Sequence, residues 1–186
     1  RIRLKEDKLS DANELLTKAE EMDKGKIREQ SFQRAEALLE GTPDMVGKAK
    51  VILYSLRDAD DEDPRPNIYL GEYYVKQSVR ELAYEELEKA ITKKPDYVPA
   101  YVYLAELKYE DGLESKKAED FNKGLEYANK AIELDAQYAA AYRIRAELYL
   151  LAKRNEKARN DMQKYVSETQ GDLNDRDRNA SFLYLS

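Results

Sequence analysis

The strongest constraint on the fold is a set of residues between Arg65 and Pro95, where small and bulky side chains alternate at the spacing of two helices joined by a turn. Small residues at a helix crossing let two backbones approach closely, and bulky residues fill the gaps beside them. The pattern therefore predicts a tightly packed helix pair. Its members are Leu70, Gly71, Tyr74, Ala83, Leu87, Ala90 and Pro95.

These spacings resemble one unit of the tetratricopeptide repeat (TPR) family, a helix–turn–helix of about 34 residues that must stack on neighbouring units to bury its apolar face. The resemblance spans nearly the whole chain. It implies an all-α fold, a right-handed superhelical solenoid of antiparallel helix pairs with about ten helices and essentially no strand. We expect one array over residues 1–186, with half-units at 1–24 and 179–186 and units at approximately 27–61, 64–97, 98–138 and 139–170.

Two places depart from the family pattern. An insertion of about 7 residues lies within Glu110–Asp120 and either extends both helices of its unit or forms a longer loop. We expect a loop that bulges from the edge of the array and whose deletion leaves the melting temperature nearly unchanged. Arg145 stands where the family has Leu, with Ile144 beside it, which favours a slightly rotated first helix.

Composition excludes several classes of function. The chain is 42% hydrophobic and 38% charged, which argues against disorder, and no apolar run approaches the roughly 20 residues of a membrane helix. Its net charge of −6, with no basic stripe, argues against nucleic-acid binding. Neither His nor Cys is present, so disulfides, thiolate nucleophiles and ordinary zinc sites are excluded. We predict no cofactor and no enzymatic activity. The chain begins at Arg1 without a signal-peptide pattern, and we interpret it as a piece of a longer protein.

The acidic run from Asp58 to Asp63 invites a calcium interpretation. An EF-hand loop needs Gly at its sixth place and Glu at its twelfth, and here those places hold Asp63 and Tyr69. The run is better interpreted as a solvated loop whose acids favour the N-terminus of the following helix, and no metal site is predicted.

The TPR resemblance implies that fixed places on each first helix line an inner groove. In this chain the ninth place of all four units holds a glutamate: Glu36, Glu72, Glu106 and Glu147. Other places expected to line the groove hold Phe32, Ile68, Val102, Ile144 and Leu150. Tyrosines at packing places, Tyr74, Tyr101, Tyr142 and Tyr149, are expected in the core. The candidate partner-binding residues are Tyr69, Glu72, Lys76, Tyr103, Glu106, Tyr109, Arg143 and Glu147.

An acidic, aromatic groove favours a protein or peptide partner with a Lys- or Arg-containing segment. The alternative is that glutamate is simply a good helix former on a solvated face. Some TPR domains bind acidic chaperone tails through a Lys/Asn/Arg carboxylate clamp. The matching places here hold Ile68 with Glu72 and Val102 with Glu106, so that clamp is absent.

The leading functional hypothesis is a protein–protein interaction scaffold that holds a partner segment in its groove. The alternative is a structural module that self-associates through its repeat ends or docks onto other parts of its own protein.

Overall fold

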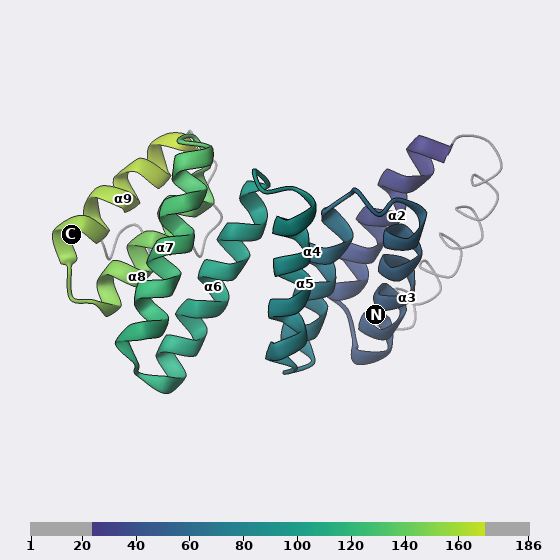
Figure 1. The fold of residues 1–186 in the computed structure, drawn as a ribbon, viewed down its shortest axis with the longest axis horizontal. Helices are drawn as coiled ribbons and strands as arrows, with labels where there is room; N and C mark the ends of the chain where they lie inside the picture. The colour runs from purple at the N-terminus through teal and green to yellow at the C-terminus, as the bar shows by residue number, and fades with distance from the viewer. Residues whose placement is uncertain (1–23, 170–186) are drawn as a thin grey trace, which may run out of the picture. The chain divides into compact units, whose positions relative to one another are not determined.

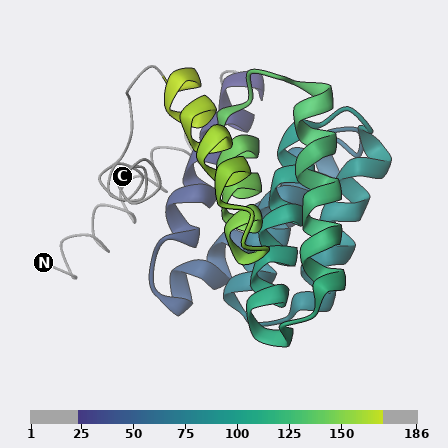
Figure 2. The ribbon, with the colours of Figure 1, turned by 90° about the vertical axis from the view of Figure 1, so that its left-hand side faces the viewer.

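The computed structural model describes residues 24–169, which contain eight α-helices and no strand (Figures 1 and 2). The all-α fold class is confirmed. The half-units expected at residues 1–24 and 179–186 lie outside this range, apart from Lys24. The helices are α2 (Lys24–Leu39), α3 (Pro43–Ala59), α4 (Arg65–Lys76), α5 (Arg80–Lys93), α6 (Val98–Ser115), α7 (Ala118–Leu134), α8 (Ala139–Leu151) and α9 (Asn155–Glu168).

The chain divides into two compact units, unit 1 up to Glu86 and unit 2 from Leu87, so the division falls within α5. Consecutive helices within each unit are joined by short turns and run antiparallel (Figure 1). Proline opens several of them: Pro43 is the first residue of α3 and Pro66 lies in the first turn of α4. Proline suits this position because its fixed backbone angle matches the helix and the N–H it lacks would have no partner there.

Unit 1 has a core built from α2, α3 and α4. Ala35 and Ala49 are fully buried where α2 and α3 pack together, and larger aliphatic side chains surround them. The remaining members of this core are Phe32, Leu38, Leu39, Val46, Leu53, Leu56 and Leu70.

Unit 2 has a core of the same design. Ala83, at the end of unit 1, and Ala90 were expected at a helix crossing, and both are fully buried; Ala131 and Ala158 of unit 2 are fully buried in the same way. Around the last two lie the bulky core residues Tyr101, Val102, Leu125, Ile144, Leu148, Met162 and Tyr165.

Two packing tyrosines make the same contact in successive helix pairs. The Tyr101 hydroxyl donates to the carbonyl oxygen of Pro95 at 2.8 Å, and the Tyr142 hydroxyl donates to that of Ala136 at 3.0 Å. Each bond reaches six residues back and ties the first turn of a helix to the turn before it. Tyr74 is also buried, as expected, whereas Tyr149 is only half-buried.

The insertion at Glu110–Asp120 is not a loop, and our expectation of a bulge was wrong. It lengthens α6 to Ser115 and starts α7 at Ala118, which leaves only Lys116 and Lys117 between the helices. Lys116 takes the left-handed conformation (φ 56°) that ends many helices, and its N–H donates to the Gly112 carbonyl at 2.9 Å.

The lengthened helices pack on each other because Gly112, which is buried in α6, admits the ring of Phe121 from α7. Polar contacts close the turn. Lys108 Nζ lies 3.1 Å from Asp111 Oδ2 and 3.2 Å from Asp120 Oδ1, and Ser115 Oγ donates to Asp120 Oδ2 at 2.7 Å. A deletion in this segment would therefore remove packed helical turns.

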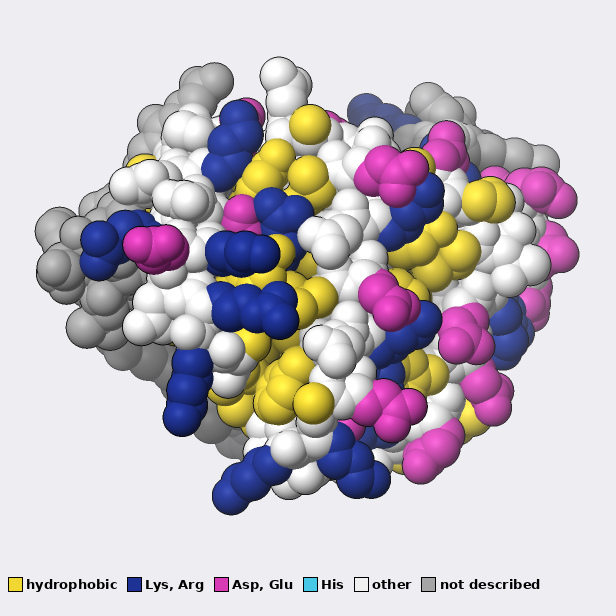
Figure 3. Space-filling model, turned by 60° about the vertical axis from the view of Figure 1, so that its left-hand side comes forward, with side chains coloured by type: hydrophobic (Ala, Val, Ile, Leu, Met, Phe, Trp, Pro, Cys, Tyr) yellow, Lys and Arg dark blue, Asp and Glu magenta, His cyan; other side chains and the backbone are white. Residues whose placement is uncertain are grey.

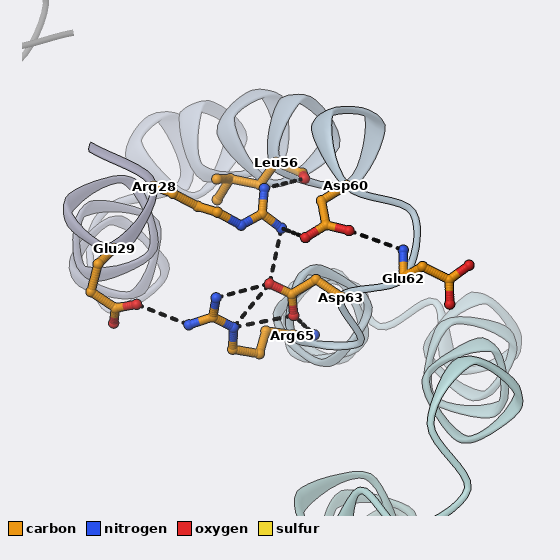
Figure 4. A network of polar contacts seen from close by, with 7 residues as sticks. All are labelled: Arg28, Glu29, Leu56, Asp60, Glu62, Asp63 and Arg65. Carbon is orange, nitrogen blue, oxygen red and sulfur yellow. Dashed lines mark hydrogen bonds and ion pairs between the residues drawn. The ribbon is translucent and has the colours of Figure 1, made fainter. Parts of the chain in front are cut away.

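The acidic run between α3 and α4 is held by arginines (Figure 4). Asp63 Oδ2 accepts hydrogen bonds from Arg28 of α2 and from Arg65 of α4, each at 2.9 Å, and Asp63 Oδ1 accepts from the Arg65 backbone N–H at 2.9 Å. Arg28 also donates to the Leu56 carbonyl at 3.1 Å, and Arg65 donates to Glu29 Oε2 at 2.9 Å. The run is exposed from Asp58 to Glu62, as expected of a solvated loop, whereas Asp63 at its end makes a junction of three helices.

The Asp63 carboxylate is nearly buried, with 9% of its side chain exposed. Burial alone would raise its pKa, but the hydrogen bonds from Arg65 and Arg28 outweigh burial and hold that pKa below its ordinary value of 3.8. Because the folded-state pKa is depressed, this carboxylate stabilises the fold above its unfolded pKa, and the stabilisation is lost as the pH falls through the folded value.

A pair of glycine substitutions tests the α6–α7 packing. Gly112→Ala should destabilise the protein by roughly 1–3 kcal/mol, because the new Cβ would overlap the Phe121 ring. Gly47→Ala is the matched control: it lies in α3, and apart from the adjoining helix backbone nothing lies within 4 Å of its Cβ position, so it should stabilise by about 0.5–1 kcal/mol through helix propensity alone. Urea unfolding followed by circular dichroism measures both, and equal stabilisation by the two variants would contradict the packing.

Removal of the Asp63 carboxylate tests the α2–α3–α4 junction. Asp63→Ala should lower the free energy of unfolding at neutral pH by roughly 1–3 kcal/mol, since it removes several charge-assisted hydrogen bonds. The difference from wild type should shrink as the pH falls below about 4. Asp58→Ala is the control: its carboxylate is 71% exposed and should change stability by less than about 0.5 kcal/mol. Equal losses in the two variants would refute the junction.

Candidate partner-binding face

The clearest candidate face lies between α6 and α8 in unit 2. Glu106 of α6 and Glu147 of α8 both bind the guanidinium of Arg143, which lies one turn before Glu147. Arg143 Nη1 donates to Glu147 Oε1 at 3.0 Å, and Nη2 donates to Glu106 Oε1. Between 23% and 31% of each of these three side chains is exposed. Two candidate acids therefore meet at one candidate base, on a surface that solvent reaches.

Negative charge remains in excess on this face because two carboxylates share one guanidinium. Burial raises the pKa of Glu106 despite the opposing attraction of Arg143, and repulsion from Glu147 and Glu110 adds to the rise. The pKa of Tyr138 is raised as well, first by burial and then by the charge of Glu106. This phenol and the acids therefore share one electrostatic environment.

Two further candidate tyrosines flank Glu106 on α6. Tyr103 and Tyr109 lie three residues to either side of it, so both are its neighbours on the helix surface, and both are half-buried. Tyr109 packs against the unit 2 core. Such rings are held by packing and still offer contact area to a ligand.

Unit 1 has an acidic cluster of its own at the end of α4. Lys76 Nζ lies 3.5 Å from Glu72 Oε1 and 3.0 Å from Oε1 of Glu40, which follows α2. Burial raises the pKa of Glu72 more than Lys76 lowers it, and Glu40 and Glu36 add repulsion. Here too one lysine, Lys76, pairs with two carboxylates.

Tyr69 lies beside this cluster. Its ring packs on Phe32 with 5.9 Å between centroids. Burial raises the pKa of Tyr69, and the charges of Glu36 and Glu72 raise it further. The side chain is half-buried, so one part of the ring packs in the core and the rest faces the acids.

Several places expected to line the groove belong to the core instead. Phe32, Ile68, Val102 and Ile144 are each at most 5% exposed, whereas Leu150 is exposed as expected. The expected groove included adjacent residues: Ile68 and Tyr69, Val102 and Tyr103, and Arg143 and Ile144. Successive residues of a helix point about 100° apart, so only one residue of each such pair reaches solvent. Three of the four recurring glutamates are paired: Glu72 with Lys76, and Glu106 and Glu147 with Arg143.

Glu40 and Tyr138 are two members of these faces that sequence reasoning missed. Glu40 follows Glu36 by one helical turn, which was a usable signal. Tyr138 directly precedes α8 and carried no such signal.

Across residues 24–169, no group of acidic side chains is arranged to hold a metal ion. None of the helices α2 to α9 combines the length and apolarity needed to span a bilayer.

Comparisons with known proteins place the fold. No protein-family model matches the chain, and no curated protein matches its sequence. Among solved structures, TTC0263, a thermophilic TPR protein of Thermus thermophilus, superposes with a TM-score of 0.71 at 16% identity, over 84% of this chain and 80% of that one.

Two other TPR structures are similar over much of the chain. The first TPR domain of Spaghetti (RPAP3), bound to the HSP90 peptide SRMEEVD, has a TM-score of 0.57 at 18% identity, over 67% of this chain and 94% of that one. YrrB, described as a TPR protein with an unusual peptide-binding site, has a TM-score of 0.57 at 18% identity, over 92% and 83%. The chain therefore has the tetratricopeptide-repeat fold.

Proposed function

We propose that this protein is an interaction scaffold that binds a Lys- or Arg-containing segment of a partner protein. The observation that carries the proposal is the arrangement of Glu106, Arg143 and Glu147, in which two partly exposed carboxylates share one base beside tyrosine rings. A cationic side chain from a partner would supply the missing positive charge, and Tyr103 and Tyr109 would offer their rings to its aliphatic part.

The internal ion pairs are within reach of an incoming cation. The Arg143–Glu147 pair has 25% and 23% of its two side chains exposed, so water screens it in part. An incoming Lys or Arg can therefore share Glu106 or Glu147 with Arg143. The Lys76 cluster of unit 1 is a separate acidic cluster of the same kind.

Two of the similar structures support peptide binding as the use of the fold. One contains an HSP90 peptide and the other is described by its peptide-binding site. The ligand proposed here differs in charge from the acidic peptide SRMEEVD, because the places where a carboxylate clamp would need Lys and Asn hold Ile68 with Glu72 and Val102 with Glu106. The specificity rests on charge: acidic segments are repelled and basic ones attracted.

Glutamine substitutions test the charge on this face. A fluorescent peptide of alternating Lys and Leu is titrated with the protein. Glu106→Gln combined with Glu147→Gln should weaken binding about tenfold, equivalent to about 1.4 kcal/mol, and flatten its salt dependence. Tyr103→Ala should weaken binding at every salt concentration, since its contribution is contact area.

The control is Glu133→Gln, which removes a 70% exposed carboxylate of α7 outside this face and should leave binding unchanged. Binding that is equal in wild type, the double glutamine variant and Tyr103→Ala would overturn the proposal. Light scattering of each variant reports whether any change comes from self-association instead.

The pH dependence gives an independent test. Burial raises the pKa of Glu72 and of Glu106, so both lose their charge on acidification at a pH above 4.5, the ordinary value. Affinity for the Lys–Leu peptide should therefore begin to fall above pH 4.5, and the part of this fall due to Glu106 should be absent from the double glutamine variant. A pH profile shared by the two proteins would contradict this assignment.

A further inference from the structure

The second surface of interest lies along the contact between α8 and α9, on a different side of α8 from Arg143. The two helices are antiparallel, and their side chains meet in three successive pairs. We call this surface the α8–α9 seam; its pairs are Tyr142 with Lys164, Arg145 with Asp161, and Tyr149 with Lys157.

The middle pair fixes the geometry of the seam. Arg145 donates from Nε and Nη2 to the two oxygens of Asp161, both at 2.7 Å, and from Nη1 to Asn129 of α7 at 2.8 Å. This explains Arg at a place where the repeat family has Leu, since one guanidinium links three helices. Its carbon centre also lies 5.5 Å from the Tyr142 ring and 5.9 Å from the Tyr149 ring.

The outer pairs present lysines on aromatic rings. Lys157 Nζ lies 5.5 Å from the Tyr149 ring centre, and Lys164 Nζ lies 6.0 Å from that of Tyr142. Lys164 also pairs with Glu168. Within the described part of the chain, Lys157 has no carboxylate within 4 Å, and neither does Arg154 in the turn before it. The seam therefore has surplus positive charge in a chain whose net charge is −6.

The combination of cations and rings suits a ligand with both carboxylates and apolar side chains. Figure 3 shows a face of the molecule on which Lys and Arg side chains lie across a strip of hydrophobic ones. The surplus is local, because the neighbouring α7 adds no excess of positive charge beside Asn129: its Glu126 and Glu133 pair with Lys123 and Lys130. A short acidic segment can use this surplus, whereas a long polyanion would extend beyond it.

We propose that the α8–α9 seam binds a short, extended, acidic segment of a partner protein. Lys157 and Lys164 are seven residues apart on α9, which is about 10.5 Å along the helix axis. In a polyproline II segment, residues three apart lie on one side and about 9.3 Å from each other. Two acidic residues at this spacing would meet the two lysines, and an apolar residue between them would lie on the half-buried ring of Tyr149.

This inference adds a second site and does not depend on the function proposed above. Arg143 and Glu147 face α6, whereas Arg145 and Tyr149 face α9, so one helix serves both surfaces. The two ligands have opposite charge. Failure of one site leaves the other testable.

The test uses a fluorescent peptide of sequence Glu-Pro-Leu-Glu-Pro-Leu-Glu and the same peptide with Gln in place of Glu, titrated with the full chain at low and physiological ionic strength. The acidic peptide should bind and the glutamine peptide should not. Lys157→Glu combined with Lys164→Glu should weaken binding at least about tenfold, while Glu106→Gln with Glu147→Gln should not weaken it.

The control variant is Lys48→Glu in α3, an exposed lysine whose charge reversal lies outside the seam; binding should stay within about twofold of wild type. Circular dichroism checks that each variant is folded. Three results would each overturn the proposal: equal binding of the two peptides, equal losses in the seam variant and Lys48→Glu, or binding of single-stranded DNA or phosphatidylserine vesicles in place of the acidic peptide.

Discussion

Close approach of helices at small residues is the constraint on which the remaining features depend. Ala131 and Ala158 are fully buried, and Gly112 and Gly124 are likewise buried where a neighbouring helix supplies Phe121 or Leu148. Because Gly and Ala leave almost no side chain between the two backbones, such crossings fix both the separation and the rotation of each helix. The positions of the outward-facing residues are then fixed as well. Charged and aromatic side chains on different helices therefore come within bonding distance of one another.

Arginines make use of this fixed geometry in both units. Arg28 and Arg65 join three helices through Asp63, Arg143 joins α6 to α8 through its two glutamates, and Arg145 joins α7, α8 and α9. The planar guanidinium offers five donors in a rigid fork, so one side chain can serve partners on several elements. Where the acids outnumber the arginine, as at Arg143, the surface stays acidic. Where one acid is matched and lysines flank it, as at Arg145, the surface becomes basic.

Much of the fold was predictable because buried small residues leave a periodic trace in the sequence. The alanine crossings and the buried Tyr74, Tyr101 and Tyr142 followed from it. The segment Glu110–Asp120 did not, because the spacing gives the length of an insertion and not its conformation; the decisive contact, Phe121 on Gly112, joins different helices. Of the candidate site, the meeting of Glu106 and Glu147 at Arg143 was only partly foreseen. Spacing gives the face of one helix, whereas pairing depends on its neighbour.

The two surfaces of α8 show why helical repeats suit assembly. Adjacent residues on a helix point about 100° apart. Glu147 therefore faces α6, Leu148 faces the core and Tyr149 faces α9. A substitution on one face leaves the others nearly untouched, provided that the buried residue between them is kept. Under the two proposals, opposite charge on the two faces would also separate their ligands: a segment attracted to one would be repelled by the other. Two partners would then bind the same helix without competing, and the buried crossings of α7 with α8 at Ala131 and of α8 with α9 at Ala158 would hold them at a fixed distance.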